Sequence, residues 1–195
     1  MNTANRRVNY THSNSYETLN SITDKTKNIW LVFHGMGYLS RYFLKYFKSL
    51  SADENYIIAP QAPSKYYLGP DFKHIGASWL TREDTINETT NILNYVDAVV
   101  EAEPIVASKL IIMGYSQGVS IACRWMASRS IQPNALVLHS GGIPVELTVD
   151  DFKYLKADTP VYYIYGESDQ YITPERLEEQ RERGVKLFAE RLSLH

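Results

Sequence analysis

Apolar and polar residues follow one another along this chain in blocks that predict alternating strands and helices. Short aliphatic runs bounded by glycine or proline predict buried strands at 28–35, 56–60, 109–114, 135–142 and 160–169. Between them, apolar residues recur at helical spacing and predict helices at 39–50, 85–102, 116–130 and 173–192. Strands that are apolar on both faces and alternate with helices are typical of a mostly parallel sheet covered by helices. We therefore expect an α/β fold in a single domain that spans 1–195.

Two of the predicted helices begin with capping signals. Thr85 and Glu88 have the spacing of a capping box, in which the two side chains satisfy backbone N–H groups at the helix start. Thr173 is followed by Pro174 and Glu175, two residues that favour the first turn of a helix. We predict that a helix begins at each of these threonines.

The stretch LIIMGYSQGVSIACRWMA (110–127) places Ser116 at the junction of a predicted strand and a predicted helix. The five residues from Gly114 to Gly118 fit the G-x-S-x-G elbow, a strained turn that exposes a serine hydroxyl. Side chains two positions before and after the serine would collide with neighbouring backbone, which favours glycine there. The alternative is a tight turn that needs only small residues. The flanking strand and helix favour a nucleophile, so Ser116 is the predicted catalytic residue.

A serine hydroxyl attacks only with help from other groups near it. It needs a base, an acid that orients the base, and N–H donors for the negative charge that develops on the substrate. After the first strong strand, the glycine-rich turn at 34–37 offers the Met36 N–H, which would pair with that of Gln117. We expect His34 to brace this turn. Asp169, just past a strand end, is the predicted acid, with Glu167 as the alternative.

The general base is harder to place. In this type of site the base follows the acid in the chain, and the one histidine after Asp169 is His195. The tail LSLH resembles the beginning of a final strand, not the loop beyond one. His139 ends a neighbouring strand but precedes the acid. We therefore hypothesise that the chain as given lacks its C-terminal strand and the loop with the catalytic histidine, with His195 as the alternative base.

Composition narrows the classes of function. A length of 195 residues is typical of a domain with one hydrophobic core. A net charge of −2 gives no electrostatic reason to expect binding to nucleic acid or to an anionic membrane surface. No apolar run approaches the roughly 20 residues that span a bilayer, so we expect no stable membrane insertion. The single cysteine, Cys123, is predicted to lie in the core and fits a reducing, cytoplasmic location. We find no metal-ligand cluster or phosphate loop and expect no cofactor.

In these residues and motifs, the chain resembles the phospholipase/carboxylesterase group of the α/β-hydrolase superfamily, which includes acyl-protein thioesterase-like enzymes. The segments that carry the resemblance are LVFHGMG, APQAPS, ASWL, MGYSQGVSIA, LHSGGIP and YGESDQYITP. The resemblance implies a three-layer sandwich without a cap domain. It also implies Ser116 as nucleophile, Asp169 as acid, and the backbones of Met36 and Gln117 as oxyanion donors.

The sequence departs from the family pattern at two places that bear on substrate choice. Family members often carry an aspartate after the HGxG turn and another after the tryptophan that matches Trp79. Here Tyr38 and the pair Leu80-Thr81 take those places. The family's substrate preference is therefore not carried over.

The segment 60–84 is a long connection between a strand and a helix. Long loops in compact domains are often binding loops, and Trp79, Tyr66 and Tyr67 are candidates to line an acyl or alcohol pocket. The alternative is a surface loop held in place by buried aromatic residues, and the sequence favours neither.

The first functional hypothesis is a serine hydrolase that cleaves carboxylic esters or thioesters through an acyl-enzyme on Ser116. Its partner would be a small-molecule acyl substrate, and the protein would be a monomer or homodimer. The alternative is a binding protein on the same scaffold, in which the elbow persists as architecture and the ligand is not turned over.

Overall fold

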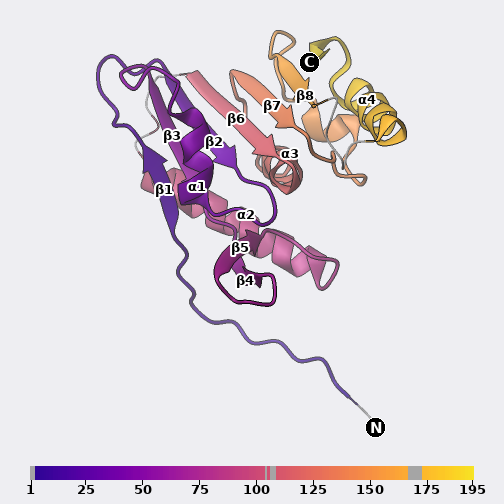
Figure 1. Ribbon diagram of the computed structural model, residues 1–195. Coiled ribbons are helices and arrows are strands. Elements are labelled where there is room, and N and C mark those ends of the chain that lie inside the picture. The colour runs from indigo at the N-terminus through magenta and orange to yellow at the C-terminus, as the bar shows by residue number, and fades with distance from the viewer. Residues whose placement is uncertain (1–2, 104, 106–108, 167–172) are drawn as a thin grey trace.

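The computed structural model describes residues 3–103, 105, 109–166 and 173–195. Its main sheet has seven strands in the order β1-β3-β2-β6-β7-β8-β9 (Figure 1). β1 pairs antiparallel with β3, and every other neighbouring pair is parallel. The strands are β1 (Tyr16–Leu19), β2 (Asn28–Phe33), β3 (Asn55–Pro60), β6 (Lys109–Tyr115), β7 (Ala135–His139), β8 (Val161–Ile164) and β9 (Leu192–Leu194).

Helices cover both faces of this sheet, with α1 in front of it and α2 behind it in Figure 1. The helices are α1 (Ser40–Phe43), α2 (Thr85–Ala102), α3 (Gln117–Arg129) and α4 (Pro174–Phe188), with 3₁₀ turns η1 (Leu44–Phe47), η2 (Val149–Phe152) and η3 (Ala189–Arg191). None of the helices in the described part of the chain is long and apolar enough to span a membrane.

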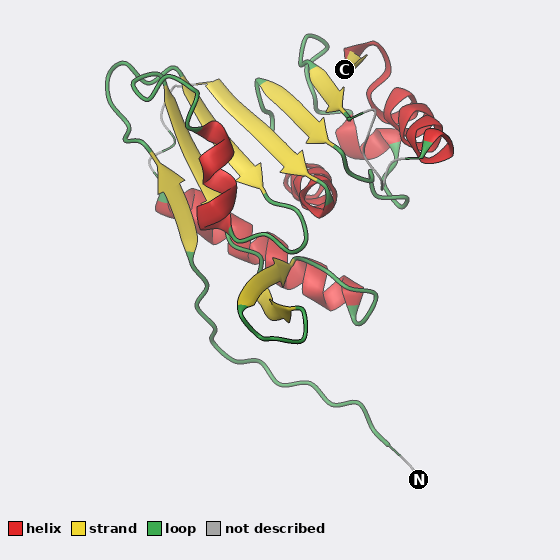
Figure 2. Ribbon diagram, in the orientation of Figure 1, coloured by secondary structure: helices red, strands yellow, loops and turns green. Residues whose placement is uncertain are grey.

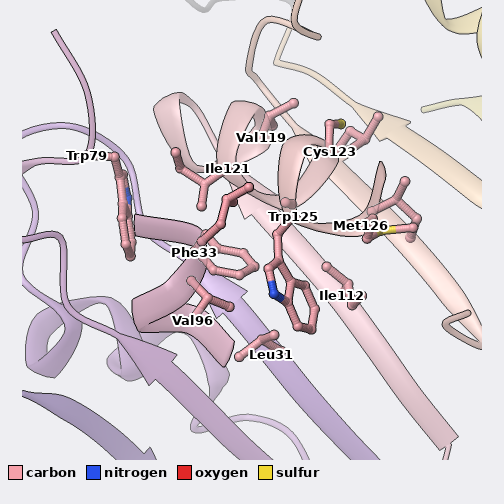
Figure 3. Packing of buried hydrophobic residues seen from close by; sticks show 14 of the residues in the cluster. Leu31, Phe33, Trp79, Val96, Ile112, Val119, Ile121, Cys123, Trp125 and Met126 are labelled. Atoms are coloured by element: carbon pink, nitrogen blue, oxygen red, sulfur yellow. The ribbon is translucent and has the colours of Figure 1, made fainter. Parts of the chain in front are cut away.

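Successive side chains along a central strand point to opposite faces of the sheet, so the core forms two layers, one on each face. Leu31 and Phe33 of β2 join one cluster with residues of α2, α3 and α4. Figure 3 shows the part of this cluster that α2 and α3 contribute. Val32 points the other way and packs with Phe43 and other residues of α1 and η1. The predicted three-layer α/β arrangement is therefore confirmed.

The five predicted strands all form, although several end before the boundary that the apolar run suggested. β7 ends at His139 and β8 at Ile164, several residues short of 142 and 169. After β7 the chain forms a loop at the carboxyl edge of the sheet, and residues 167–169 of the predicted strand 160–169 lie outside the described residues. β1, at the outer edge beside β3, was not predicted, because the polar segment around it lacks an apolar run.

The segment 60–84 contains a small antiparallel hairpin that the sequence analysis missed. β4 (Ser64–Leu68) pairs with β5 (His74–Ser78) as a separate two-stranded sheet. Most of β4 is exposed, so no apolar pattern marks it as a strand. Figure 2 shows the hairpin near the ends of the central strands, away from the seven-stranded sheet.

The predicted helix at 39–50 is shorter and tighter than expected. Only Ser40–Phe43 is α-helical, and 3₁₀ geometry follows as far as Phe47. The apolar residues that recur at helical spacing within 39–50 include Tyr42 and Tyr46, but these two residues are 47% and 66% exposed. The buried residues Leu39, Phe43 and Phe47 keep a helical spacing, so the two tyrosines lie at the border of the apolar face and not within it.

One of the two predicted caps is confirmed and the other is wrong. Thr173 caps α4 by accepting a hydrogen bond from the Arg176 N–H at 3.3 Å. The cap of α2 is Asp84, which has a left-handed backbone and no side-chain cap hydrogen bond. The Thr85 hydroxyl instead donates to the Thr81 carbonyl at 2.9 Å, so no capping box forms with Glu88.

The C-terminal segment ends its helix earlier than predicted. α4 stops at Phe188, and Leu192–Leu194 form β9, which pairs in parallel with β8. The tail therefore forms a short strand, as its sequence suggests, and the hypothesis of a missing C-terminal strand and histidine loop stays a prediction. A Cβ on Gly184 would lie 2.9 Å from Leu192 Cδ2, which explains a glycine in the middle of α4.

Candidate active site

Ser116 lies on the turn between β6 and α3, with φ 52° and ψ −118°. Such a backbone conformation is strained for a residue with a side chain. A Cβ on Gly114 would lie 2.5 Å from the Val119 backbone nitrogen, and one on Gly118 would lie 2.1 Å from the Phe33 carbonyl oxygen. Both glycines are therefore required by backbone packing, as the elbow motif predicts.

The end of β7 holds this elbow from its other side. The Ser116 N–H donates to the His139 carbonyl at 2.8 Å, and the Ser116 carbonyl accepts from the Val119 N–H at 3.1 Å. A Cβ on Gly141 would lie only 2.2 Å from the Ser116 carbonyl oxygen. The serine is thus fixed by backbone contacts while its side chain remains partly accessible.

The glycine-rich turn after β2 lies against the serine. A Cβ on Gly35 would approach the Ser116 Cβ to 3.1 Å. The Gly37 N–H donates to the Ala77 carbonyl at 2.8 Å, and the Tyr38 N–H donates to the Gly35 carbonyl at 3.2 Å. The Met36 backbone is held between these bonds. The structure therefore brings the two predicted oxyanion segments, at Met36 and Gln117, to the same edge of the sheet.

The β4–β5 hairpin supports the same turn. A Cβ on Gly76 would lie 2.7 to 2.9 Å from three backbone atoms of Gly37. Only a glycine at this position allows β5 to contact the turn that closely. Gly76 is a positioning residue that the sequence analysis missed, because the hairpin itself was not predicted.

The side chain of Gln117 has a structural role that the motif does not suggest. Its Oε1 accepts from the Trp79 N–H at 2.8 Å, and its Nε2 donates to the Leu80 carbonyl at 2.6 Å. These bonds tie the residue after the serine to the chain that follows β5. The elbow and the hairpin are therefore joined through one amide side chain.

His34 braces the turn, as expected, and is fully buried. Its Nε2 accepts from the Ala62 N–H at 3.1 Å, so its Nδ1 carries the proton and donates to the Gly35 carbonyl at 2.8 Å. Burial lowers the pKa of His34 to about 4, which keeps the ring neutral near pH 7. A neutral histidine with both nitrogens engaged is suited to holding backbone in place.

Trp79 lies in the core, 1% exposed, and its Nε1–H donates to the His34 carbonyl at 2.8 Å. Its ring packs edge-on against Phe33. By contrast, Tyr66 and Tyr67 are 39% and 55% exposed. This arrangement fits the alternative in which a buried aromatic residue holds the loop, and it leaves the two tyrosines at the surface.

Two histidines that are candidate bases, His139 and His195, lie at different places relative to Tyr115, the residue before the serine. The His139 ring packs on Tyr115 with centroids 5.1 Å apart. His195 continues β9 beside β8, and the register places it three strands from Tyr115, about 14 Å at the usual strand spacing. The predicted acid Asp169 and its alternative Glu167 lie outside the described residues.

A hollow of about 370 Å³ opens beside the glycine-rich turn, between the start of α1 and the hairpin, and Gly37 forms part of its wall. A larger hollow of about 600 Å³ lies between α2 and α3, around Arg124 and Glu146. Ser116 lines neither of these two hollows, and of the two the smaller one is lined by a residue of the glycine-rich turn, so the smaller hollow is the one that adjoins the candidate site. Among the described residues, no group of three His, Cys, Asp or Glu could hold a metal ion.

The strand order, the helices on both faces and the strand–turn–helix at Ser116 place this protein among the α/β-hydrolases. Residues 14–193 match the Phospholipase/Carboxylesterase family, and the chain therefore belongs to that family. This confirms the resemblance, and membership indicates a hydrolase of the esterase, thioesterase and phospholipase type. No curated protein matches the chain in a sequence search.

Solved structures share the fold at low sequence identity. Acyl-protein thioesterase 2 of Zea mays is 16% identical, with a TM-score of 0.68 over 93% of this chain and 88% of the other. A phospholipase/carboxylesterase of Dyadobacter fermentans is 22% identical, with a TM-score of 0.63 over 95% and 87%. Esterase PE8 is 21% identical, with a TM-score of 0.63 over 94% and 88%. At these identities the comparisons establish the fold alone.

Proposed function

We propose that this protein is a serine hydrolase that cleaves carboxylic esters or thioesters, with Ser116 as the nucleophile. The observation that carries the proposal is the strained backbone of Ser116 between two glycines that admit no Cβ. Strain at a non-glycine residue persists only where the surrounding structure imposes it, and it is concentrated at functional sites. The family match and the thioesterase and esterase names of the structural relatives support the same class of reaction.

In the proposed reaction the Ser116 oxygen attacks the acyl carbon while its proton passes to a histidine base. The negative charge on the former carbonyl oxygen is stabilised by the backbone N–H groups of Met36 and Gln117. The alcohol or thiol leaves with the proton from the base, and an acyl-enzyme remains. Water then attacks this ester in the same way and releases the acid and the free serine. Asp169 would orient the base.

We propose that the base is a histidine C-terminal to residue 195. His34 is buried with both ring nitrogens engaged, and His139 precedes the predicted acid in the chain. His195 lies about 14 Å along the sheet from Tyr115. β9 runs parallel to β8, so its carboxyl end lies at the same edge of the sheet as Ser116. Mass spectrometry of the protein from its source tests this proposal, and a natural terminus at residue 195 would contradict it.

A covalent probe tests the nucleophile directly. We expect a fluorophosphonate to label full-length protein once, at Ser116, and Ser116→Ala to abolish both labelling and hydrolysis of p-nitrophenyl esters. Ser120→Ala, one turn further along α3, is the matched control and should keep both activities. Intact wild-type protein that resists the probe and hydrolyses no ester would support the alternative of a binding protein.

A further inference from the structure

The hollow beside the glycine-rich turn combines an apolar wall with a cationic rim. Tyr38, Leu68 and Ile75 contribute the wall, whereas Arg41, Lys73 and His74 contribute nitrogen-bearing side chains. At about 370 Å³ its size is within the usual range for small-molecule sites. A site of this composition suits a ligand that is itself part apolar and part charged.

The hollow adjoins the turn that carries the proposed oxyanion donor. Gly37 lines it, and Gly35, two residues earlier, lies against the Ser116 side chain, with a would-be Cβ 3.1 Å from the serine Cβ. The Met36 backbone therefore separates the hollow from the serine. A substrate whose carbonyl oxygen lies at the Met36 N–H can extend one of its two arms into the hollow.

The charge around the hollow has one sign. None of the nine lining residues is Asp or Glu, although the whole chain has a net charge of −2. Arg41 lies over the Tyr42 ring, 4.9 Å from its centroid, which holds the guanidinium near the rim. Lys73 faces Asp71 at 3.7 Å, but both side chains are half or more exposed, so this ion pair is weak.

We propose that this hollow binds a phosphate or carboxylate attached to an apolar stem, so that the preferred substrates are anionic acyl esters or thioesters. This inference rests on the proposed function and narrows its substrate class. Arg41 forms paired hydrogen bonds to the anion, Lys73 adds a point charge, and Tyr38, Leu68 and Ile75 contact the stem.

Binding to Ser116→Ala protein tests the site without depending on turnover. Calorimetric titrations compare octyl phosphate with octanol and with inorganic phosphate. We expect octyl phosphate to bind at least tenfold more tightly than either, and its affinity to fall with added salt. Equal affinity for octanol and octyl phosphate would overturn the proposal, as would equal affinity for inorganic phosphate and octyl phosphate.

A pair of double variants locates the charge. Arg41→Met with Lys73→Met should weaken octyl phosphate binding about tenfold and leave octanol binding unchanged. Lys48→Met with Lys109→Met removes the same charge away from the hollow and is the matched control. If the control weakens octyl phosphate binding as much as the test pair does, the anion is not held at this hollow.

Hydrolysis by full-length protein then shows which arm of the substrate carries the anion. In the first pair of substrates, monoacylglycerol phosphate is compared with monoacylglycerol, and the charge lies on the leaving alcohol. In the second pair, mono-p-nitrophenyl adipate is compared with p-nitrophenyl hexanoate, and the charge lies on the acyl chain. We expect at least a tenfold higher kcat/KM for the anionic member of one pair. Hydrolysis without such a preference overturns the anionic site alone. If octyl phosphate binds to the hollow but no ester is hydrolysed, the proposed hydrolase function is wrong and the anionic binding site is still supported.

Discussion

At the scale of single residues, His34 and Ser116 show how backbone packing determines the chemistry of a side chain. His34 is an ionisable group that burial keeps neutral, so it can hold the glycine-rich turn through two hydrogen bonds. Ser116 is held in a conformation that a side-chain-bearing residue rarely adopts, because strand, helix and neighbouring turn leave no other path for the chain. A rigid brace and a strained turn therefore lie at the same edge of the sheet.

The lowered pKa of His34 makes stability depend on pH. Its pKa is about 4 in the folded protein and about 6.5 in the unfolded chain, so unfolding takes up a proton between these values. Stability from this residue is present above pH 6.5 and is lost as the pH falls toward 4. We expect wild-type protein to lose about 2 kcal/mol of unfolding free energy between pH 7 and pH 5 from this source.

Urea denaturation at both pH values measures this loss. His34→Gln should be less stable than wild type at pH 7. Its free energy of unfolding should fall by about 2 kcal/mol less than that of wild type between pH 7 and pH 5. His12→Gln, at an exposed position in the N-terminal segment, is the control and should retain the wild-type slope. Parallel pH profiles for wild type and His34→Gln would contradict the assigned protonation state.

At the scale of elements, the β4–β5 hairpin is the part that connects the sheet edge to the candidate site. It contacts the glycine-rich turn through Gly76, and the chain after β5 is bonded to Gln117 at the elbow. It also forms one side of the proposed anion site. The sequence did not reveal it, because its residues are mostly exposed and obtain their strand geometry from each other and from the turn that they contact.

Substitution of Gly76 tests this connection. A methyl group there must displace the Gly37 backbone, so we expect Gly76→Ala to lower stability by about 1 to 3 kcal/mol. It should also lower kcat for ester hydrolysis about tenfold or more, with a smaller change in KM, because the Met36 N–H moves with the turn. Gly142→Ala is the matched control, since its added Cβ has no neighbour nearer than 4.0 Å among the described residues. Wild-type kcat in Gly76→Ala would show that the hairpin does not position the turn.

At the scale of the whole molecule, the sheet brings together segments far apart in the chain. Residues 33–37 and 114–118 meet at its carboxyl edge because the parallel strands β2 and β6 end there, and residues 76–80 of the hairpin and the chain after it contact both segments. α3 then packs across the sheet with its apolar side in the larger core cluster. The candidate site is therefore stable only while this core is intact.

The reactivity of the Cys123 thiol measures how often that core opens. It is fully buried in α3, and burial raises the pKa of its thiol to about 12. We expect native protein to react with an aromatic disulfide reagent only through global unfolding, with a labelling rate that rises with urea as steeply as the equilibrium transition. Cys123→Ser protein is the control for non-specific reaction. Stoichiometric labelling within minutes in native buffer would show that α3 opens independently of the rest.

Local patterns along the chain suffice to predict five strands, the helices α3 and α4, the Thr173 cap and the glycines around Ser116. These follow from periodicity and from steric limits between residues a few positions apart. By contrast, the outward position of Tyr42, the hairpin at 64–78 and the need for glycine at position 76 emerge only in the folded protein. Each of these depends on contacts between segments distant in the chain, and a pattern read along one segment contains no information about its neighbours in space.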